Sequence, residues 1–422
     1  MQSEGNYMKK SKKIIVSVLL TVALAGAFGL GFLTKTFSMS ADSRAAVNLI
    51  EKYKKYYLFE EDGVIDKISD ALLDDYSGYQ SKQTYKDIQD SAKGSSAGIG
   101  VQINRETLEI TKVLGNSPAE KAGVKEGGIV VRYDVGAGEK RADSAAEFLT
   151  DLDAVGSDKT FVLTLSYGGD EVSYNLKKSN YTRTYVKFGD DSGYYSFLSD
   201  GDEISVAKLS DEAYIFDPSA FYIRYDSFSG TKSGIEGSVG QLKTALDKMK
   251  ERGKTHLVFD LRGNGGGYMS ILTEVATLLT PTSESKFLIG YAENKRGNRS
   301  EFYGKNPTFY SYGIEKFSVL GDSGTASASE ALIGALLDYA DKSGYGGLTV
   351  YVEGSDGVYK TYGKGIMQST FKNADGSAVK LTTDKLYFPM SGISIHGTGI
   401  TEKTSPRVKS AETGAALAAA LG

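Results

Sequence analysis

The stretch GTASASEALIGALLDYA, residues 324–340, is the segment on which the prediction of the fold depends most. Ser327 and Glu330 have the three-residue spacing of a capping box, and leucine and isoleucine then recur at helical intervals. The stretch therefore predicts a helix that begins close to Ser327. Taken alone, the motif is more typical of a helix cap than of a nucleophile. Only a chemical partner elsewhere in the chain would change that interpretation.

Composition excludes several classes of function. The 422 residues exceed one typical domain, so two or three units are expected. A net charge of −4 gives no reason to expect nucleic-acid binding, and the absence of cysteine excludes disulfides, thiolate metal sites and thiol nucleophiles. His256 and His396 are the two histidines of the chain, which excludes a His-rich metal site and leaves two candidates for the base of a Ser-His-Asp mechanism.

The N-terminus predicts a membrane segment. Four lysines in KKSKK, residues 9–13, precede the uncharged residues 14–33, and a helix needs roughly 20 apolar residues to cross a bilayer. The stretch is longer than the apolar core of a cleaved signal peptide. We therefore expect a cytoplasmic tail at 1–13, a signal-anchor at 14–33 and an extracytoplasmic protein held at the cell membrane. The ALAGA sequence leaves open the alternative of secretion after signal cleavage.

The remaining chain changes character along its length. Residues 40–92 are helical in pattern, with DYSGYQS at 75–81 as an interrupting loop. Residues 94–180 contain short β-like runs and one short helix, SPAEKAGV, and predict a compact β-rich module. The polar stretch 187–203 is typical of a linker or an exposed loop.

Beyond this stretch, helices alternate with short buried strands. GQLKTALDKMKERG, YMSILTEVATLLT and ASEALIGALLDYA predict helices, and THLVFDLR, KFSVL and GLTVYVEG predict strands. Such alternation is typical of a layered α/β domain.

The glycine-rich sequence DLRGNGGG, residues 260–267, follows one of these strands. A dinucleotide fingerprint needs glycine where Tyr268 stands, and a phosphate loop needs Gly-Lys followed by Ser or Thr, so both are excluded. Two interpretations stay open: a tight turn without a ligand, or a turn whose backbone N–H groups bind a developing negative charge.

A second constellation is YGKGIMQ, residues 362–368. Lys364 lies between two glycines, so it can approach another backbone closely, and desolvation would lower its pKa enough for a general base. Gln368, four residues later, could orient the amine by a hydrogen bond. The alternative is an exposed lysine in a turn.

Together, TASASE, GKG with a glutamine four residues on, and DLRxNxGG resemble the C-terminal processing peptidases, also called tail-specific proteases. The resemblance implies a multidomain α/β protein. Its parts would be an N-terminal helical region at 40–92, a PDZ domain at 94–180, a Ser-Lys protease core at 181–405 and a C-terminal helical tail at 406–422. FYIRYDSFS and SGISIHGTGIT resemble core strands of the family.

The resemblance also implies roles for single residues. Ser327 matches the nucleophile, Lys364 the general base and Gln368 its orienting partner. Asp338 matches an acid that serves either as a charge partner or in a structural role, and Ser329 is the competing nucleophile. The further residues implied are the oxyanion-hole donors Ala328 and Gly266 and the peptide-binding loop of the PDZ domain, Gly98, Ile99, Gly100 and Val101.

The chain departs from the family pattern in two places. Lys364 follows Ser327 by 37 residues, a longer interval than is usual in the family, and the resemblance implies insertions at ADKSGYGG and GSDGVYKT. The PDZ segment has GGIVV, where an aspartate commonly follows the first glycine.

We therefore expect a membrane-anchored, extracytoplasmic serine endopeptidase that recognises C-terminal tails through its PDZ domain and needs neither ATP nor metal. Its partners would be proteins or peptides with accessible C-terminal tails, and the membrane; no nucleic acid is expected, and a homo-oligomer is left open. The alternative is a catalytically inactive PDZ scaffold of the same fold. A trypsin-like protease is disfavoured because His256 falls in a buried strand.

Overall fold

The computed structural model describes residues 71–422, apart from 93–94, 105–106, 157–158, 201–202, 211–212, 216 and 231–233, together with isolated positions between 43 and 68. The chain forms two compact units, Met1–Ile68 and Ser69–Gly422, and every element named here belongs to the second. The predicted cytoplasmic tail and membrane segment at 1–33 lie outside the described residues. No helix among the residues described is long and apolar enough to span a membrane.

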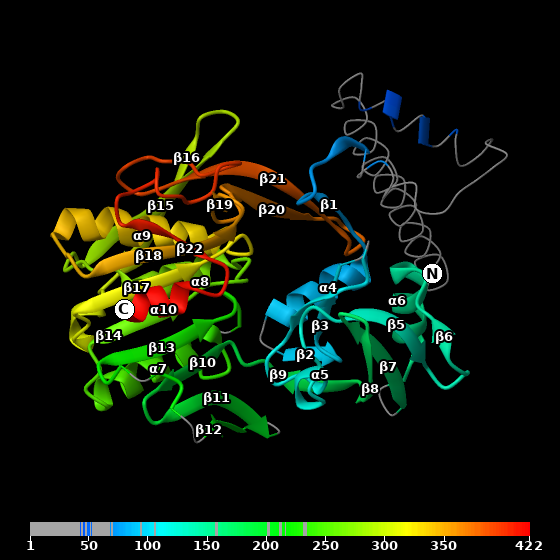
Figure 1. Ribbon diagram of the computed structural model, residues 1–422. Helices are drawn as coiled ribbons and strands as arrows, with labels where there is room; N and C mark the ends of the chain where they lie inside the picture. Colours follow the sequence, from blue (N-terminus) through cyan, green and yellow to red (C-terminus); the bar gives the residue numbers. More distant parts are fainter. Residues whose placement is uncertain are drawn as a thin grey trace, which may run out of the picture. The chain divides into compact units, whose positions relative to one another are not determined.

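The larger unit contains a nine-stranded sheet (Figure 1). Its strands are β10 (Val186–Asp190), β11 (Gly193–Asp200), β12 (Glu203–Ser210), β13 (Ala220–Tyr225), β14 (His256–Asp260), β17 (Lys316–Gly321), β18 (Leu348–Ser355), β19 (Val358–Tyr359) and β22 (Val408–Glu412). They follow in the order β12-β11-β10-β13-β14-β17-β18-β19, and β22 also pairs with β18. The neighbours β13, β14, β17, β18 and β22 run parallel to one another.

Helices cover both faces of this sheet because successive side chains of a strand point to opposite sides. In β13, Phe221 and Ile223 belong to the main hydrophobic core, to which helices α7 (Ser238–Glu251), α8 (Met269–Leu279) and α9 (Ala328–Ser343) also contribute. Tyr222 of the same strand packs on the other side with α10 (Ala416–Leu421). The layered α/β architecture predicted for this part of the chain is confirmed.

The topology brings two loops together. The strands β14 and β17 are parallel neighbours, and the glycine-rich turn follows β14 whereas the segment that leads to Ser327 follows β17. Since the carboxyl ends of parallel strands meet at the same edge of a sheet, these loops share one edge, the usual position of a site in an open α/β sheet.

The β-rich module has its own core. It contains the pairs β2 (Ser95–Gly98) with β9 (Ser179–Thr182) and β3 (Val101–Ile103) with β4 (Ile110–Val113), the sheet of β6 (Lys140–Arg141), β5 (Ile129–Asp134), β7 (Thr160–Tyr167) and β8 (Asp170–Lys177), and helices α5 (Pro118–Lys121) and α6 (Ala145–Ala154). Phe148 of α6 and Leu163 of β7 are fully buried in a core separate from that of the large sheet. Helix α5 begins at Ser117, whose Oγ accepts from the N–H of Glu120 at 3.1 Å, as expected for the predicted short helix.

A second, five-stranded sheet joins distant parts of the chain. Its strands are β1 (Gly78–Gln80), β15 (Lys286–Asn294), β16 (Arg299–Lys305), β20 (Ile366–Lys372) and β21 (Ala378–Tyr387), and helix α4 (Lys82–Ala92) follows β1. The prediction of a loop at 75–81 is therefore wrong for residues 78–80. Three residues are too few to show a period, and pairing with β21 determines their conformation.

The stretch 187–203 is also not a linker. It forms β10, β11 and the start of β12, and Phe188 and Phe197 are fully buried. Aspartate, glycine and serine dominate the composition, but the aromatic side chains between them supply the apolar surface that the sheet buries.

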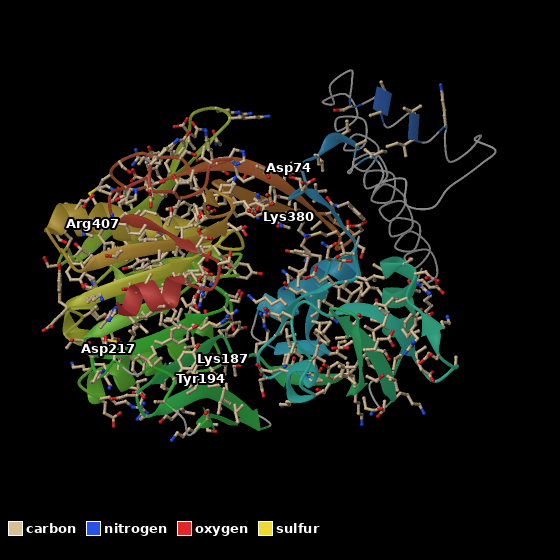
Figure 2. All side chains as sticks on the ribbon, viewed as in Figure 1. Asp74, Lys187, Tyr194, Asp217, Lys380 and Arg407 are labelled. Carbon is tan, nitrogen blue, oxygen red and sulfur yellow. The ribbon has the colours of Figure 1, made fainter. Side chains whose placement is uncertain are left out.

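Two predictions near the C-terminus need correction. Residues 391–401, expected to be a core strand, form turns and irregular backbone. The predicted helical tail at 406–422 begins with β22, an added strand of the large sheet, and is helical only in α10. Arg407, just before β22, donates from Nε to Asp341 Oδ1 at 2.7 Å and so fastens this segment to the end of α9 (Figure 2).

Gly334 in α9 tests how closely this helix packs. Its Cα faces the ring of Phe388, so a Cβ would overlap that ring. Helix propensity alone favours Gly334→Ala by about 1 kcal/mol, whereas overpacking typically costs about 1–3 kcal/mol. We expect Gly334→Ala to lower the melting temperature. Gly346→Ala is the control, because that position has open space around it. A more stable Gly334→Ala protein would contradict this packing.

Candidate active site

The glycine-rich turn starts from a buried charge cluster at the end of β14. Asp260 is fully buried and accepts from Arg262 Nη2 at 2.6 Å and from the hydroxyl of Tyr222 at 2.7 Å. Arg262 also donates to Glu353 at 2.8 Å. The acid and the arginine of DLRGNGGG therefore anchor the turn and do not face a ligand.

The turn then passes directly over Ser327. Gly266 has φ +97°, and a Cβ there would lie 2.7 Å from the Ala326 oxygen, 2.8 Å from the Ala328 nitrogen and 2.9 Å from the Ser327 Cβ. Only glycine fits this approach. The N–H of Gly266 donates to Asn264 Oδ1 at 2.9 Å. Gly266 was predicted to donate to an oxyanion, but in this conformation its N–H is already used inside the turn.

Ser327 is the N-cap of α9, as the sequence predicts. Its backbone has φ 58° and ψ −114°, a conformation that residues other than glycine rarely adopt. Such strain persists only where the surrounding structure enforces it, and it is frequent at functional sites. The side chain is half-buried, and Ser327 forms a capping box with Glu330 at the start of α9. The hydroxyl is thus accessible at a helix N-terminus.

Ser329, the competing candidate, has a different environment. It is fully buried, and its Oγ donates to the backbone oxygen of Asn264 at 2.9 Å. The N–H of Ala326 donates to the same oxygen at 3.0 Å. Ser329 therefore holds the turn against α9 and does not reach the surface where a substrate would bind.

The carboxylate of Glu330 connects the Ser327 segment with the Lys364 segment. It is fully buried, and Oε2 accepts from the backbone N–H of Ser327 and of Lys364, both at 2.9 Å. Oε1 accepts from the N–H of Gly363 at 2.8 Å and from Thr361 Oγ1 at 2.6 Å. Burial raises the pKa of Glu330, and these four hydrogen bonds oppose the shift. The sequence indicated only the capping contact to Ser327; no local pattern pointed to the bonds with residues 361–364.

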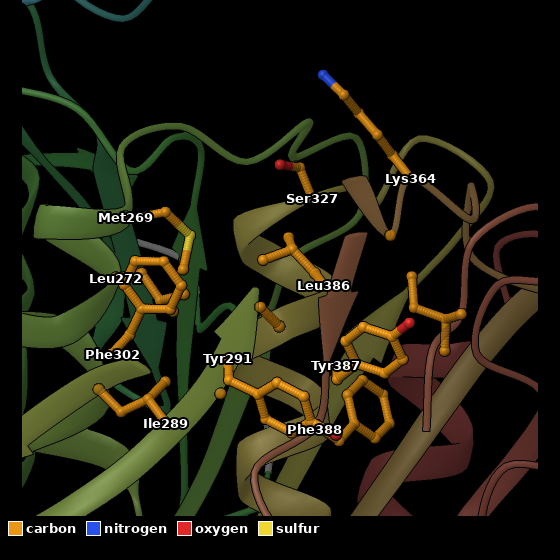
Figure 3. A pocket seen from close by; sticks show the side chains of 14 residues that line it. Met269, Leu272, Ile289, Tyr291, Phe302, Ser327, Lys364, Leu386, Tyr387 and Phe388 are labelled. Carbon is orange, nitrogen blue, oxygen red and sulfur yellow. The ribbon is translucent and has the colours of Figure 1, made fainter. Parts of the chain in front are cut away.

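Lys364 lies beside Ser327 at the rim of the same pocket (Figure 3). Burial lowers the pKa of its amine, the charge of Lys380 lowers it further, and Asp74 and Glu330 act in the opposite direction. Its Nζ lies 4.3 Å from the ring centroid of Tyr76. No hydrogen bond between this Nζ and Ser327 Oγ is present in the described part of the chain, and in Figure 3 the amine rises above the pocket without meeting the hydroxyl.

Close backbone packing explains the glycines on each side of Lys364. A Cβ at Gly363 would lie 2.9 Å from the nitrogen of Gly399, and one at Gly365 would lie 2.6 Å from the nitrogen of His396. The expectation that this lysine approaches another backbone is confirmed, since the irregular segment 391–401 runs beside it.

Gln368 and Asp338 do not contact Lys364 in this structure. Gln368, on β20, donates from Nε2 to Thr382 Oγ1 at 3.1 Å. Asp338, on α9, accepts from the N–H groups of Met390 and Ser391 at 2.8 and 3.0 Å. The hydrogen bond predicted between Gln368 and the lysine amine is absent here. Asp338 therefore has the structural role of the two alternatives: it binds the backbone of the loop that follows β21.

An apolar pocket opens next to Ser327 and Lys364 (Figure 3). Its walls include Met269, Leu272, Tyr291, Phe302, Leu386 and Phe388. The free volume is about 20 Å³, slightly more than a single water molecule needs. The pocket therefore admits a small apolar group in this conformation.

His256 provides no base for Ser327. His256 is the first residue of β14, at the opposite end of the strand from the glycine-rich turn, and its Nε2 lies 3.0 Å from Ser318 Oγ. Burial lowers its pKa to about 4, and the charge of Lys316 adds to this shift. The trypsin-like alternative thus lacks its catalytic histidine at this position.

The predicted peptide-binding loop of the β-rich module lies between β2 and β3. Gly98 and Gly100 have φ +122° and +79°, and the Ile99 oxygen accepts from the N–H of Ala119 at 2.9 Å. The loop therefore packs against the start of α5, and the side chain of Ile99 is buried in the module's core.

A lysine of the same module touches the glycine-rich turn. The Nζ of Lys112, on β4, donates to the backbone oxygen of Asp226 at 2.8 Å and of Gly263 at 3.4 Å. Burial lowers the pKa of this amine. Nothing in the sequence around Lys112 signalled this contact.

Known proteins share both sequence and fold with this chain. Residues 220–405 match the family model described as Peptidase family S41. A probable CtpA-like serine protease of Staphylococcus haemolyticus is 26% identical over 408 residues, which cover 93% of this chain and 72% of that protein. A protein of the same description from Staphylococcus aureus is 25% identical over 401 residues, covering 92% and 70%. The solved structure of a photosystem II D1 C-terminal processing protease has a TM-score of 0.53 at 21% identity and covers 87% of each chain.

The α/β core, the strained serine at a helix N-terminus and these relatives define a serine peptidase. Residues 220–405 match peptidase family S41, and the relatives that the chain resembles over most of its length are described as CtpA-like serine proteases.

Replacement of Glu330 tests its connecting role. Glu330→Gln keeps the shape but turns an amide group toward backbone donors, and each buried donor left unpaired costs about 1–3 kcal/mol. Since a displacement of reacting groups by about 1 Å can cost roughly a hundredfold in rate, we expect turnover to fall by at least about tenfold, together with a lower melting temperature. Glu284→Gln, at an exposed position, is the control. Wild-type turnover in Glu330→Gln would contradict the role.

Proposed function

We propose that the chain cleaves peptide bonds by a Ser-Lys mechanism, with Ser327 as nucleophile and Lys364 as general base. The observation that carries the proposal is the Glu330 carboxylate, which accepts from the backbone N–H of both residues at 2.9 Å. Two residues 37 positions apart in the sequence are thereby held at one edge of the sheet. The strained backbone of Ser327 and the lowered pKa of the Lys364 amine support the same roles.

The chemistry follows from these groups. The neutral amine of Lys364 takes the proton of Ser327 Oγ while the oxygen attacks the substrate carbonyl. The resulting ammonium then protonates the leaving amine, and water repeats the sequence on the acyl-enzyme. The N–H of Ala328, at the first position of α9, would stabilise the oxyanion with the help of the helix dipole. The Lys364 side chain must first move toward Ser327, because the amine does not meet the hydroxyl in this conformation.

The apolar pocket indicates which residue is acylated. Because its walls carry no charged side chain near Ser327 other than Lys364, a charged substrate residue would be buried there without a partner. The small free volume favours alanine over larger side chains. The proposed substrates are therefore proteins or peptides with a small apolar residue before the cleaved bond.

Substrate tails would bind to the β-rich module, residues 94–180, as to a PDZ domain. An extended peptide would add as a strand and place its terminal carboxylate at the backbone of Gly98, Ile99, Gly100 and Val101. The hydrogen bonds from Lys112 to the turn at Gly263 and to Asp226 support a coupling between this module and the catalytic loop. The cell-membrane anchor at 14–33, with the catalytic part outside the cytoplasm, belongs to the same proposal and rests on the sequence alone.

The alternative is an inactive scaffold that binds tails without cleaving them. The intact Ser327, Lys364 and Gln368 favour the enzyme over the scaffold. Cleavage of an unstructured protein with an apolar tail, compared with the same protein with a charged tail, distinguishes the two. A wild-type protein that binds the tails and cleaves neither would establish the scaffold.

Substitution of the two serines tests the nucleophile. We expect Ser327→Ala to lower turnover by about three orders of magnitude or more, since residues of a catalytic pair act as a unit. Its melting temperature should change little. Ser329→Ala is the matched control: it loses one buried hydrogen bond, worth about 1 kcal/mol, and should be less stable yet active. Cleavage by Ser327→Ala at the wild-type rate would contradict the assignment.

A further inference from the structure

An N-terminal arm, residues 74–80, reaches the active site from the start of the larger unit. Its strand β1 pairs with β21 in the register Gly78 with Lys380 and Gln80 with Ala378. The backbone N–H of Thr382 donates to Ser77 Oγ at 2.8 Å. These bonds fix the arm beside the segment that carries Lys364.

Tyr76, two residues before β1, contacts the proposed base. The Lys364 Nζ lies 4.3 Å from the centroid of the Tyr76 ring. The hydroxyl of Tyr76 donates to the hydroxyl of Tyr362 at 2.8 Å, and the two rings meet edge to face at 6.4 Å. Tyr362 is itself only two residues from Lys364, so this hydrogen bond ties Tyr76 to the segment that carries the lysine.

The contact with the ring favours one protonation state of Lys364. An aromatic face attracts an ammonium and not a neutral amine, so it stabilises the protonated form of the lysine. A general base must be neutral and must reach the serine hydroxyl. In the observed conformation the Lys364 amine instead lies over the Tyr76 ring and does not meet the Ser327 hydroxyl (Figure 3). The Tyr76 contact therefore favours a form of Lys364 with the wrong protonation state and the wrong orientation for attack.

Other charged groups also face Lys364. The positive charge of Lys380, on β21, lowers the pKa of the Lys364 amine. The carboxylates of Asp74, on the arm, and Glu330, on α9, raise it (Figure 2 labels Asp74 and Lys380). Burial, the hydrogen bond to Tyr362 and nearby acidic groups all raise the pKa of the Tyr76 phenol, so the ring stays neutral and acts through its face. The arm thus contributes two groups, Asp74 and Tyr76, that favour the charged form of the lysine.

We propose that Tyr76 is a positioning residue that holds the Lys364 side chain as an ammonium away from Ser327, so that the enzyme becomes competent when the lysine leaves the ring. The proposal rests on the proposed role of Lys364 as base. A cation–π contact of this kind changes an equilibrium by about twofold to thirtyfold. The competent fraction of the free enzyme, and with it kcat/KM, is reduced by a factor of this size.

The test measures kcat/KM against pH for the purified protein, with an unstructured protein substrate. Tyr76→Leu removes the aromatic face and keeps an apolar cover over the amine. At pH values where Lys364 is mostly protonated, we expect this variant to raise kcat/KM by about twofold to thirtyfold. The acid limb of the profile, the range in which kcat/KM rises with pH, should move to lower pH. Tyr76→Phe keeps the ring face and loses only the bond to Tyr362, so its limb should stay close to that of the wild type. Lys380→Met removes a positive charge near the amine and should move the limb to higher pH.

A second measurement does not depend on activity. Titration of the Lys364 amine by the ¹³Cε chemical shift should give a lower pKa in Tyr76→Leu than in wild type, because the ammonium has lost the ring. A Tyr76→Leu protein with an unchanged lysine titration and an unchanged or lower kcat/KM would overturn the proposal. If Lys364→Ala itself cleaves at the wild-type rate, the role of the lysine as base fails, a result that the Tyr76 variants alone would not produce.

Discussion

The buried carboxylate of Glu330 is the interaction on which the site depends. It is fully buried and accepts four hydrogen bonds from donors on two segments, residues 327 and 361–364. A carboxylate is buried at low cost only if its acceptor sites are filled. The backbone of Ser327 and that of Lys364 are therefore fixed relative to each other through one side chain. The length of the chain between them does not matter to this geometry, which explains how a long interval of 37 residues is accommodated.

Glycines supply the second constraint. Gly266 lets the turn after β14 lie on Ser327, and Gly363 and Gly365 let the lysine segment lie on residues 396–399. The backbone positions are thus closely packed, and the Lys364 amine lies 4.3 Å from the centroid of the Tyr76 ring. In the proposed mechanism only this side chain has to move for Lys364 to reach Ser327. Lys112 adds a contact between the β-rich module and the same turn.

Local patterns predicted the elements of the α/β core well, because α7, α8 and α9 have clear helical periods and β14 and β17 are short apolar runs. They also identified Ser327 at the start of α9. Prediction failed where pairing or distant contacts decide the outcome: β1 is three residues long, and β10 and β11 are polar in composition but bury Phe188 and Phe197. Gln368 was assigned to Lys364 from its spacing, yet on β20 its cross-strand neighbour Thr382 takes the bond. The contact between Tyr76 and Lys364, 288 residues apart in the chain, had no signal in the sequence.

The most direct test of the account is a double-mutant cycle on turnover with Ser327→Ala, Lys364→Ala and the double variant. If the two side chains act as one catalytic unit joined through Glu330, the double variant should be no slower than either single variant, as is found for residues that act together. If the two losses multiply, the side chains act independently, and the Ser-Lys pair is not the catalytic unit.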